Sequence, residues 1–169
     1  TGYRPIGLDH FARPDDPLSI AADADALHRN FQGYTTDDAI ALIGLGASAI
    51  GSLPQGYVQN DPDIRAYHAA VSEDRLATRR GVPLSPDDRL RRAIITDLMC
   101  HFEVDLGPYS ETFRDQATPS LDDFIEDEMV EMSDRTLRIT ERGKPFVRSV
   151  CARFDTYLTR DRARHSTAV

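Results

Sequence analysis

The sequence has 169 residues, of which 40% are hydrophobic and 28% are charged. With 28 acidic residues against 20 lysines and arginines, the net charge of −8 argues against general binding to nucleic acid or anionic lipid. No apolar run reaches the roughly 18 residues of a membrane span, and two cysteines make neither a disulfide framework nor a zinc pattern. These features predict a globular cytoplasmic protein of one domain or two small ones.

The first 82 residues alternate between strand-like and helix-like segments, which is typical of an α/β fold. The expected elements are a strand within residues 4–12, a helix at about 17–27, an irregular loop at 28–36, a strand at 39–43, a glycine-rich loop closed by Pro54, and a helix at 61–72. The continuous apolar run at 39–43 favours a strand buried on both faces of a parallel sheet. Asp61 and Pro62 predict the N-cap and first position of the last helix.

The stretch Gly81-Val82-Pro83 marks an expected domain boundary, which gives domains at 1–82 and 83–169. Ser85 and Pro86 then predict the start of a long helix. Further expected elements are a short helix at 108–115, a helix at 119–129, a small β-hairpin at 130–139, and a final helix at 142–160 that buries Phe146, Val147, Val150, Cys151, Phe154 and Leu158. Helices followed by a hairpin and another helix resemble a winged-helix arrangement.

Residues 44–49 match the glycine pattern of a dinucleotide-binding turn, G-x-G-x-x-A, after an apparent strand. That fold needs a long helix directly after the glycines and an acid in a second strand. Pro54 stops such a helix early, and Asp61 and Asp63 start a helix instead. A tight turn and a close backbone approach to a ligand both remain open.

Asp9, His10 and His28 are the polar groups nearest the first expected strand end. A metal site needs three or four ligands in geometry, so hydrogen-bonded loop residues are the simpler interpretation. In an α/β barrel the carboxyl ends of the strands face the active site, which favours a functional role for Asp9, His10 and Gln32.

Two further groups could recognise a ligand. Phe31 could stack on a planar molecule, Gln32 could donate and accept hydrogen bonds, and Gly33 leaves room for close approach. A basic cluster would suit a substrate with several carboxylates, since guanidinium groups match carboxylates with two parallel bonds. Its members are Arg79, Arg80, Arg89, Arg91 and Arg92. The alternative for the first group is a well-packed loop, and the alternative for the arginines is a solvated helix face.

Three blocks together carry a resemblance: GLDHFA at 7–12, HRNFQGYTT at 28–36 and GLGASAI at 44–50, with CARFDTYL at 151–158 in support. They resemble the end of oxygen-independent coproporphyrinogen III oxidase, a radical S-adenosylmethionine family. The resemblance implies the last strand–helix elements of a partial (β/α) barrel at 1–82, followed by a mostly helical, winged-helix-like domain at 83–169. The fold class expected is therefore mixed α/β and α+β.

The family converts two propionates of coproporphyrinogen III to vinyl groups, giving protoporphyrinogen IX in haem biosynthesis. Its cofactors are S-adenosylmethionine and a [4Fe-4S] cluster. By similarity, Ile50 contacts S-adenosylmethionine, and Phe31 and Gln32 lie close to the cofactor and the substrate cavity as catalytic residues. Within the basic cluster, Arg79 and Arg80 are the residues expected to bind the substrate carboxylates.

The cluster-binding C-x-x-x-C-x-x-C motif is absent from this sequence. Because the chain also starts at Thr1, we expect a C-terminal piece whose partner is the N-terminal barrel portion, and no oxidase activity from the piece alone. The alternative is a nucleic-acid-binding winged-helix protein. It is disfavoured because the helix at 119–129 is acidic and the hairpin offers only Arg135 and Arg138 as bases.

Overall fold

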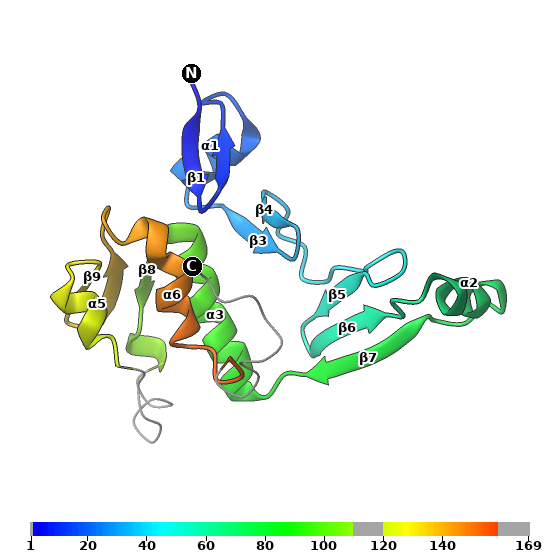
Figure 1. Ribbon diagram of the computed structural model, residues 1–169. Helices are drawn as coiled ribbons and strands as arrows, with labels where there is room; N and C mark the ends of the chain where they lie inside the picture. The colour runs from blue at the N-terminus through cyan, green and yellow to red at the C-terminus, as the bar shows by residue number, and fades with distance from the viewer. Residues whose placement is uncertain (1, 110–119, 159–169) are drawn as a thin grey trace. The chain divides into compact units, whose positions relative to one another are not determined.

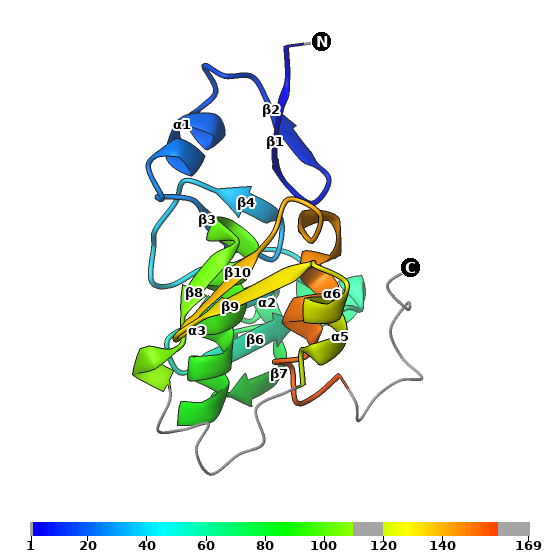
Figure 2. The ribbon, with the colours of Figure 1, turned by 90° about the vertical axis from the view of Figure 1, so that its left-hand side faces the viewer.

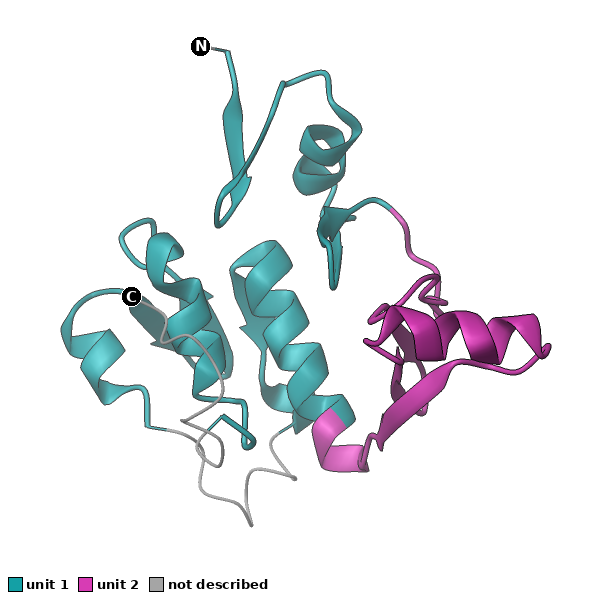
Figure 3. Ribbon diagram, turned by 45° about the vertical axis from the view of Figure 1, so that its right-hand side comes forward, with its two compact units in different colours: residues 1–36, 89–169 teal, residues 37–88 magenta. Residues whose placement is uncertain are grey.

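The computed structural model describes residues 2–109 and 120–158, which divide into two compact units (Figure 3). Unit 1 comprises 1–36 and 89–169, and unit 2 comprises 37–88. The units therefore divide at two places, whereas the sequence suggested one boundary between residues 82 and 83; the assignment of 1–82 and 83–169 to two domains stays a prediction. No helix in the described ranges is long and apolar enough to cross a membrane.

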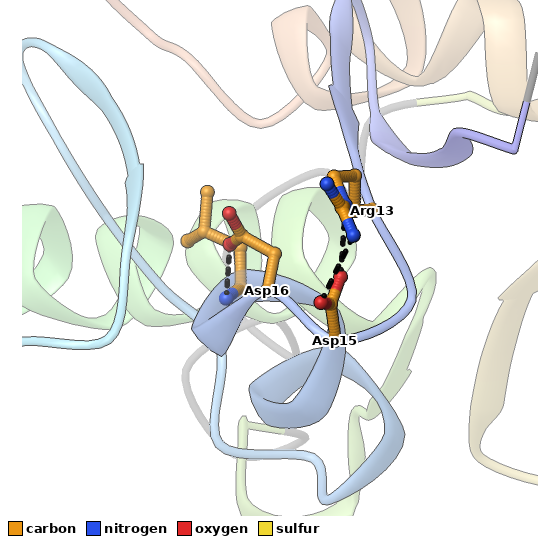
Figure 4. A network of polar contacts seen from close by, with 4 residues as sticks. Arg13, Asp15 and Asp16 are labelled. Atoms are coloured by element: carbon orange, nitrogen blue, oxygen red, sulfur yellow. Dashed lines mark hydrogen bonds and ion pairs between the residues drawn. The ribbon is translucent and has the colours of Figure 1, made fainter.

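Unit 1 begins with a β-hairpin and a short helix. Strands β1 (Arg4–Gly7) and β2 (His10–Ala12) pair antiparallel, so the strand expected within 4–12 is two strands joined by a tight turn. Helix α1 (Pro17–Asp23) starts where predicted and ends sooner. Figure 4 shows its start, where Asp16 Oδ1 accepts a hydrogen bond of 2.8 Å from the Leu18 N–H. Arg13 binds Asp15 beside it.

A second hairpin follows, and the prediction of an irregular loop at 28–36 is wrong. Strands β3 (His28–Asn30) and β4 (Gly33–Thr35) pair antiparallel around a two-residue turn. Strands of three residues are too short to show the alternation that identifies a strand in sequence. The hairpin is anchored by the buried side chains of Leu27 and Tyr34.

The rest of unit 1 packs helices with a three-stranded antiparallel sheet in the order β8-β10-β9 (Figure 2). Its elements along the chain are α3 (Pro86–His101, whose last thirteen residues belong to unit 1), β8 (Glu103–Asp105), η1 (Gly107–Tyr109), α5 (Asp122–Glu126), β9 (Val130–Ser133), β10 (Thr136–Ile139), η2 (Lys144–Phe146) and α6 (Val147–Ala152) (Figure 1). The expected hairpin is confirmed, and β8 is an additional strand on its far side.

The long helix α3 starts as predicted. Ser85 Oγ accepts from the Asp88 N–H at 3.1 Å, while Asp88 Oδ2 accepts from the Ser85 N–H at 2.9 Å. This reciprocal pair satisfies donors that the helix itself leaves open. The helices expected at 119–129 and 142–160 are shorter, and of the one expected at 108–115 only η1 lies among the described residues.

The core of unit 1 forms between α3, the sheet and α6. Its largest fully buried side chains include Ile94, Leu98, Leu137 and Phe154. The final segment buries Val147, Val150, Cys151 and Phe154 as expected. Phe146 and Leu158 were predicted to be buried as well, but they are 47% and 43% exposed, because the regular helix covers only Val147–Ala152.

Unit 2 is a three-stranded antiparallel sheet with one helix. Strands β5 (Ile50–Leu53), β6 (Gly56–Asn60) and β7 (Thr78–Pro83) are ordered β5-β6-β7. Helix α2 (Ile64–Ser72) lies between β6 and β7 in the chain. Its N-cap is Asp63, whose Oδ1 accepts from the Ala66 N–H, so the predicted cap at Asp61 is two residues early.

The buried parallel strand predicted at 39–43 is not formed. Ile40 and Ile43 are 84% and 69% exposed, and only Leu42 makes an isolated antiparallel bridge, to Ser52. A short apolar run does not by itself show whether anything covers it. Every strand pair in the described ranges is antiparallel. The mixed α/β class is observed, and the partial barrel stays a prediction.

Candidate functional site

The turn between β3 and β4 presents two of the predicted site residues to the exterior. Phe31 is 53% exposed and Gln32 is also exposed. Asn30 Oδ1 accepts a hydrogen bond of 2.8 Å from the Gln32 N–H, and Gly33 has a φ of 138°, a conformation that side chains rarely adopt. The turn therefore holds an aromatic ring and an amide where a ligand could reach both.

Tyr34 fixes this turn to the helical core of unit 1. Its hydroxyl donates to the backbone carbonyl of Met99 at 2.8 Å, in the buried interior. The His10 ring packs edge-on against the Tyr34 ring, with centroids 5.1 Å apart and planes at 84°. Two glycines make this packing possible: a Cβ on Gly7 would lie 2.3 Å from Tyr34 Oη, and one on Gly33 would lie 2.5 Å from His10 Nε2.

The electrostatics around Tyr34 are dominated by burial and by one cation. The Arg29 guanidinium carbon lies 4.8 Å from the centre of the Tyr34 ring. Burial raises the pKa of Tyr34 to about 12, and the charge of Arg29 opposes that rise. Burial also raises the pKa of Cys100 to about 11 and that of Cys151 to about 12. All three groups are thus protonated and unreactive near neutral pH.

Asp9 and His10 form a pair at the tip of the first hairpin. Asp9 Oδ1 lies 3.0 Å from His10 Nδ1. A hydrogen bond from its own backbone, and then the one from His10, lower the pKa of the Asp9 carboxyl. The pairing fixes the imidazole so that its other nitrogen, Nε2, lies against Gly33.

In unit 2, two of the predicted residues lie in one row across the sheet. Ile50 on β5 is opposite Gln59 on β6, and Gln59 is opposite Arg80 on β7. Gln59 links Arg80 to the loop that precedes β5, because its amide N–H donates to the Ser48 carbonyl at 2.9 Å and its amide oxygen accepts from Arg80 Nε at 2.7 Å. No sequence pattern singles out Gln59, because its position opposite Ile50 and Arg80 depends on the register of the strands.

The glycine-rich loop is shaped by side chains from β6 and α2. The Asn60 amide donates to the carbonyls of Gly44 and Gly46, at 3.0 Å each. The Gly46 N–H donates to the hydroxyl of Tyr67, also at 3.0 Å. The loop is thus held in one conformation by groups far away in sequence.

The predicted arginine cluster is not a single exposed patch. Arg79 and Arg80 are exposed on β7, and Arg79 Nε lies 4.0 Å from Asp61. Arg91, by contrast, is 7% exposed and donates to the Phe154 carbonyl at 3.3 Å, so it supports the core. Among residues 2–109 and 120–158, no group of three or more His, Cys, Asp or Glu is arranged to hold a metal.

Residues 84–146 match the family model described as the HemN C-terminal domain. The chain is 47% identical over 176 residues to an oxygen-independent coproporphyrinogen III oxidase of Bradyrhizobium diazoefficiens, covering 99% of this chain and 39% of that protein. The corresponding Pseudomonas aeruginosa protein is 42% identical, over 93% of this chain and 36% of its own length.

A solved structure also matches. Coproporphyrinogen III oxidase (HemN) of Escherichia coli, described as a radical SAM enzyme, is similar with a TM-score of 0.84 and 39% identity, over 93% of this chain and 38% of that one. The resemblance expected from the sequence is confirmed, and the chain corresponds to a C-terminal segment of these proteins. It spans 39% or less of the length of the three. The matches do not favour a nucleic-acid-binding protein.

Proposed function

We propose that this chain is the C-terminal portion of an oxygen-independent coproporphyrinogen III oxidase, and that the whole enzyme decarboxylates two propionates of coproporphyrinogen III. The observation that carries the proposal is the 47% identity over 99% of the chain. A similarity of that extent includes the exposed β3–β4 turn as well as the core.

The iron–sulfur cluster does not fit the residues of this chain. A cluster needs several cysteine thiolates, and Cys100 and Cys151 are buried thiols whose pKa values burial raises to about 11 and about 12. We assign the cluster to the remainder of the enzyme, together with the radical chemistry that it starts on S-adenosylmethionine. This segment on its own is then inactive.

We propose that Ile50 offers its backbone to S-adenosylmethionine. Ser52 exchanges two hydrogen bonds with Leu42, on the side of β5 away from β6. Because backbone groups alternate along a strand, Ile50 directs its N–H and C=O to that same side, two residues earlier. The outer edge of β5 at Ile50 is therefore suited to pair with the polar part of a ligand.

We propose ligand contacts for four more residues. Phe31 and Gln32 are suited to the substrate cavity, because the turn exposes both side chains and Tyr34 anchors it from behind. Arg79 and Arg80 are suited to carboxylates, since β7 leaves both exposed. The hydrogen bond from Arg80 to Gln59 also orients that guanidinium.

The finer description of the fold is part of the same proposal. A winged-helix-like domain is supported by the element order α3, β8, α5, β9, β10 and by the sheet order β8-β10-β9. The family match begins at Leu84, next to the proposed boundary of 82/83. Residues 1–82 would then supply the last elements of the barrel.

A hybrid enzyme tests the proposed function. In it, this chain replaces the matching segment of the Bradyrhizobium diazoefficiens relative, and anaerobic protoporphyrinogen formation is followed with the unmodified relative and a segment-deleted form as controls. We expect activity from the hybrid and none from the deleted form or from this chain alone. A hybrid that folds, carries its cluster and cleaves S-adenosylmethionine, yet forms no product, would contradict the proposal.

A further inference from the structure

Two cationic or potentially cationic side chains flank the Tyr34 ring beside the Phe31–Gln32 turn. Arg29 and Tyr34 are directly opposite each other on β3 and β4, so they share one face of the hairpin. The guanidinium carbon is 4.8 Å from the centre of the ring, and the His10 imidazole contacts the same ring edge-on at 5.1 Å. The two groups come from separate hairpins, and Tyr34 brings them together.

Both groups have unused hydrogen-bonding capacity. Arg29 Nη1 is buried and has no hydrogen-bond partner among the described residues. Such a donor is costly, since a buried charged group must normally be paired or hydrogen-bonded. His10 uses only Nδ1, on Asp9, and within the described ranges its Nε2 makes no hydrogen bond. With Nδ1 directed to Asp9, Nε2 is the ring nitrogen left to interact with a ligand.

The charge balance at this place calls for an anion. Asp9 is the carboxylate that interacts with Arg29, but its side chain is 90% exposed and its hydrogen bond goes to His10. Arg29 also lies close enough to Tyr34, Cys100 and Cys151 to lower their pKa values, but all three are protonated near neutral pH because burial raises those values. Within residues 2–109 and 120–158, no carboxylate forms an ion pair with the half-buried Arg29.

We propose that Arg29 and His10 form a carboxylate-binding site that takes one propionate of the tetrapyrrole, with Phe31 and Gln32 next to it. Guanidinium is the side chain best matched to a carboxylate, and the phenol face of Tyr34 holds it in place. The inference rests on the proposed function, but it concerns other residues than the arginines named there. Those lie on β7 in unit 2, where Arg79 contacts Asp61 and Arg80 donates to Gln59.

Binding of coproporphyrin III, the stable oxidised form of the substrate, to this chain tests the site by fluorescence titration. The variants are Arg29→Gln and His10→Gln, with Arg13→Gln as the matched control, since Arg13 is an exposed arginine of unit 1 paired with Asp15. We expect Arg29→Gln to weaken binding about ten-fold or more, the loss typical of a charge-assisted hydrogen bond. His10→Gln should weaken it less, and Arg13→Gln should leave it unchanged.

The tetramethyl ester of coproporphyrin III, which lacks the charges, should bind the unmodified chain weakly and should not distinguish the variants. Arg29→Lys keeps the positive charge but lacks the planar guanidinium, so we expect it to bind coproporphyrin III at an intermediate level. If Arg29→Gln does not fold, the binding of Arg29→Lys tests the proposal in its place. Equal binding by the unmodified chain and the folded Arg29 variants would overturn the inference, as would absence of saturable binding by the unmodified chain. Neither outcome would touch the proposed function, which the activity of the hybrid enzyme decides independently.

Discussion

The two units bury their apolar residues to very different degrees. In unit 1, Ile94, Leu98 and Phe154 are fully buried in one continuous core. In unit 2, Ala70 is the one buried hydrophobic residue in the described part of the chain, while Leu45 and Leu76 are 85% and 89% exposed. Unit 1 is therefore stabilised by hydrophobic burial. Unit 2 is stabilised by the backbone hydrogen bonds of its sheet and by side-chain hydrogen bonds such as those from the Asn60 amide to the glycine-rich loop. We expect unit 2 to open at a lower free energy than unit 1.

Truncating the core of unit 1 should have the largest effect. Phe154→Ala removes a side chain of 0% exposure and should lower the free energy of unfolding by about 3–5 kcal/mol. Leu76→Ala is the control, because a side chain 89% exposed should cost less than about 0.5 kcal/mol. Chemical denaturation measures both. Similar losses for the two variants would show that unit 2 has a core of its own.

Alkaline pH should weaken unit 1 through its buried thiols. Burial raises the pKa of Cys100 to about 11 and of Cys151 to about 12, from an ordinary value of 9.0. The unfolded chain then loses these protons first, so stability is intact below pH 9 and falls as pH rises toward 11 and 12. The two thiols together should cost about 2 kcal/mol between pH 9 and pH 10. Unfolding measured across that range should show a shallower slope in Cys100→Ala, and an unchanged slope would refute the assignment.

A methyl group at Gly56 should disrupt unit 2 and leave unit 1 intact. Its Cβ would lie 2.2 Å from the Val82 carbonyl oxygen, which is backbone of the paired strand and cannot move aside. Gly56→Ala should destabilise the β6–β7 pairing by about 1–3 kcal/mol. Gly81→Ala is the matched control on the same sheet, since its nearest neighbour would be at 3.4 Å. Hydrogen exchange should show that amide protection is lost only in residues 50–83. Loss of amide protection in α6 as well would mean that the two units unfold together.

The sequence predicts structure well where the signal is local. The Ser85 cap was readable because its partner Asp88 lies in the next turn. The β9–β10 hairpin was readable because Val130 and Leu137 alternate with polar neighbours. In contrast, the strands of the β3–β4 hairpin are three residues each, below the length at which alternation is visible.

The candidate site shows the same division. Phe31 and Gln32 could be proposed because they stand in an unusual local motif, and the structure places both in an exposed turn. Arg29 belongs to that motif too, but its importance depends on Tyr34 opposite and on Cys100 nearby in space. Contacts between segments that are distant in sequence cannot be predicted from periodicity. The buried Arg29 Nη1, which has no hydrogen-bond partner among the described residues, could therefore be identified only from the structure.

Removal of one helix cap from each unit gives the smallest and most closely matched comparison. Asp16 Oδ1 accepts from the Leu18 N–H in unit 1, and Asp63 Oδ1 accepts from the Ala66 N–H in unit 2, both at 2.8 Å. Replacing either aspartate with alanine should cost its own helix about 1 kcal/mol. The effect on the whole molecule should differ, because α1 packs Ala21 into a core cluster while α2 buries only Ala70.

Asp16→Ala should therefore lower the midpoint of global unfolding, whereas Asp63→Ala should speed hydrogen exchange within α2 and leave that midpoint unchanged. Both losses should persist in salt, since a cap satisfies a backbone N–H by direct contact and is not a long-range charge effect. Equal shifts of the global midpoint would mean that unit 2 unfolds with unit 1. In that case the exposed apolar residues of unit 2 would not be a sign of independent opening, and the contrast in burial would have no energetic counterpart.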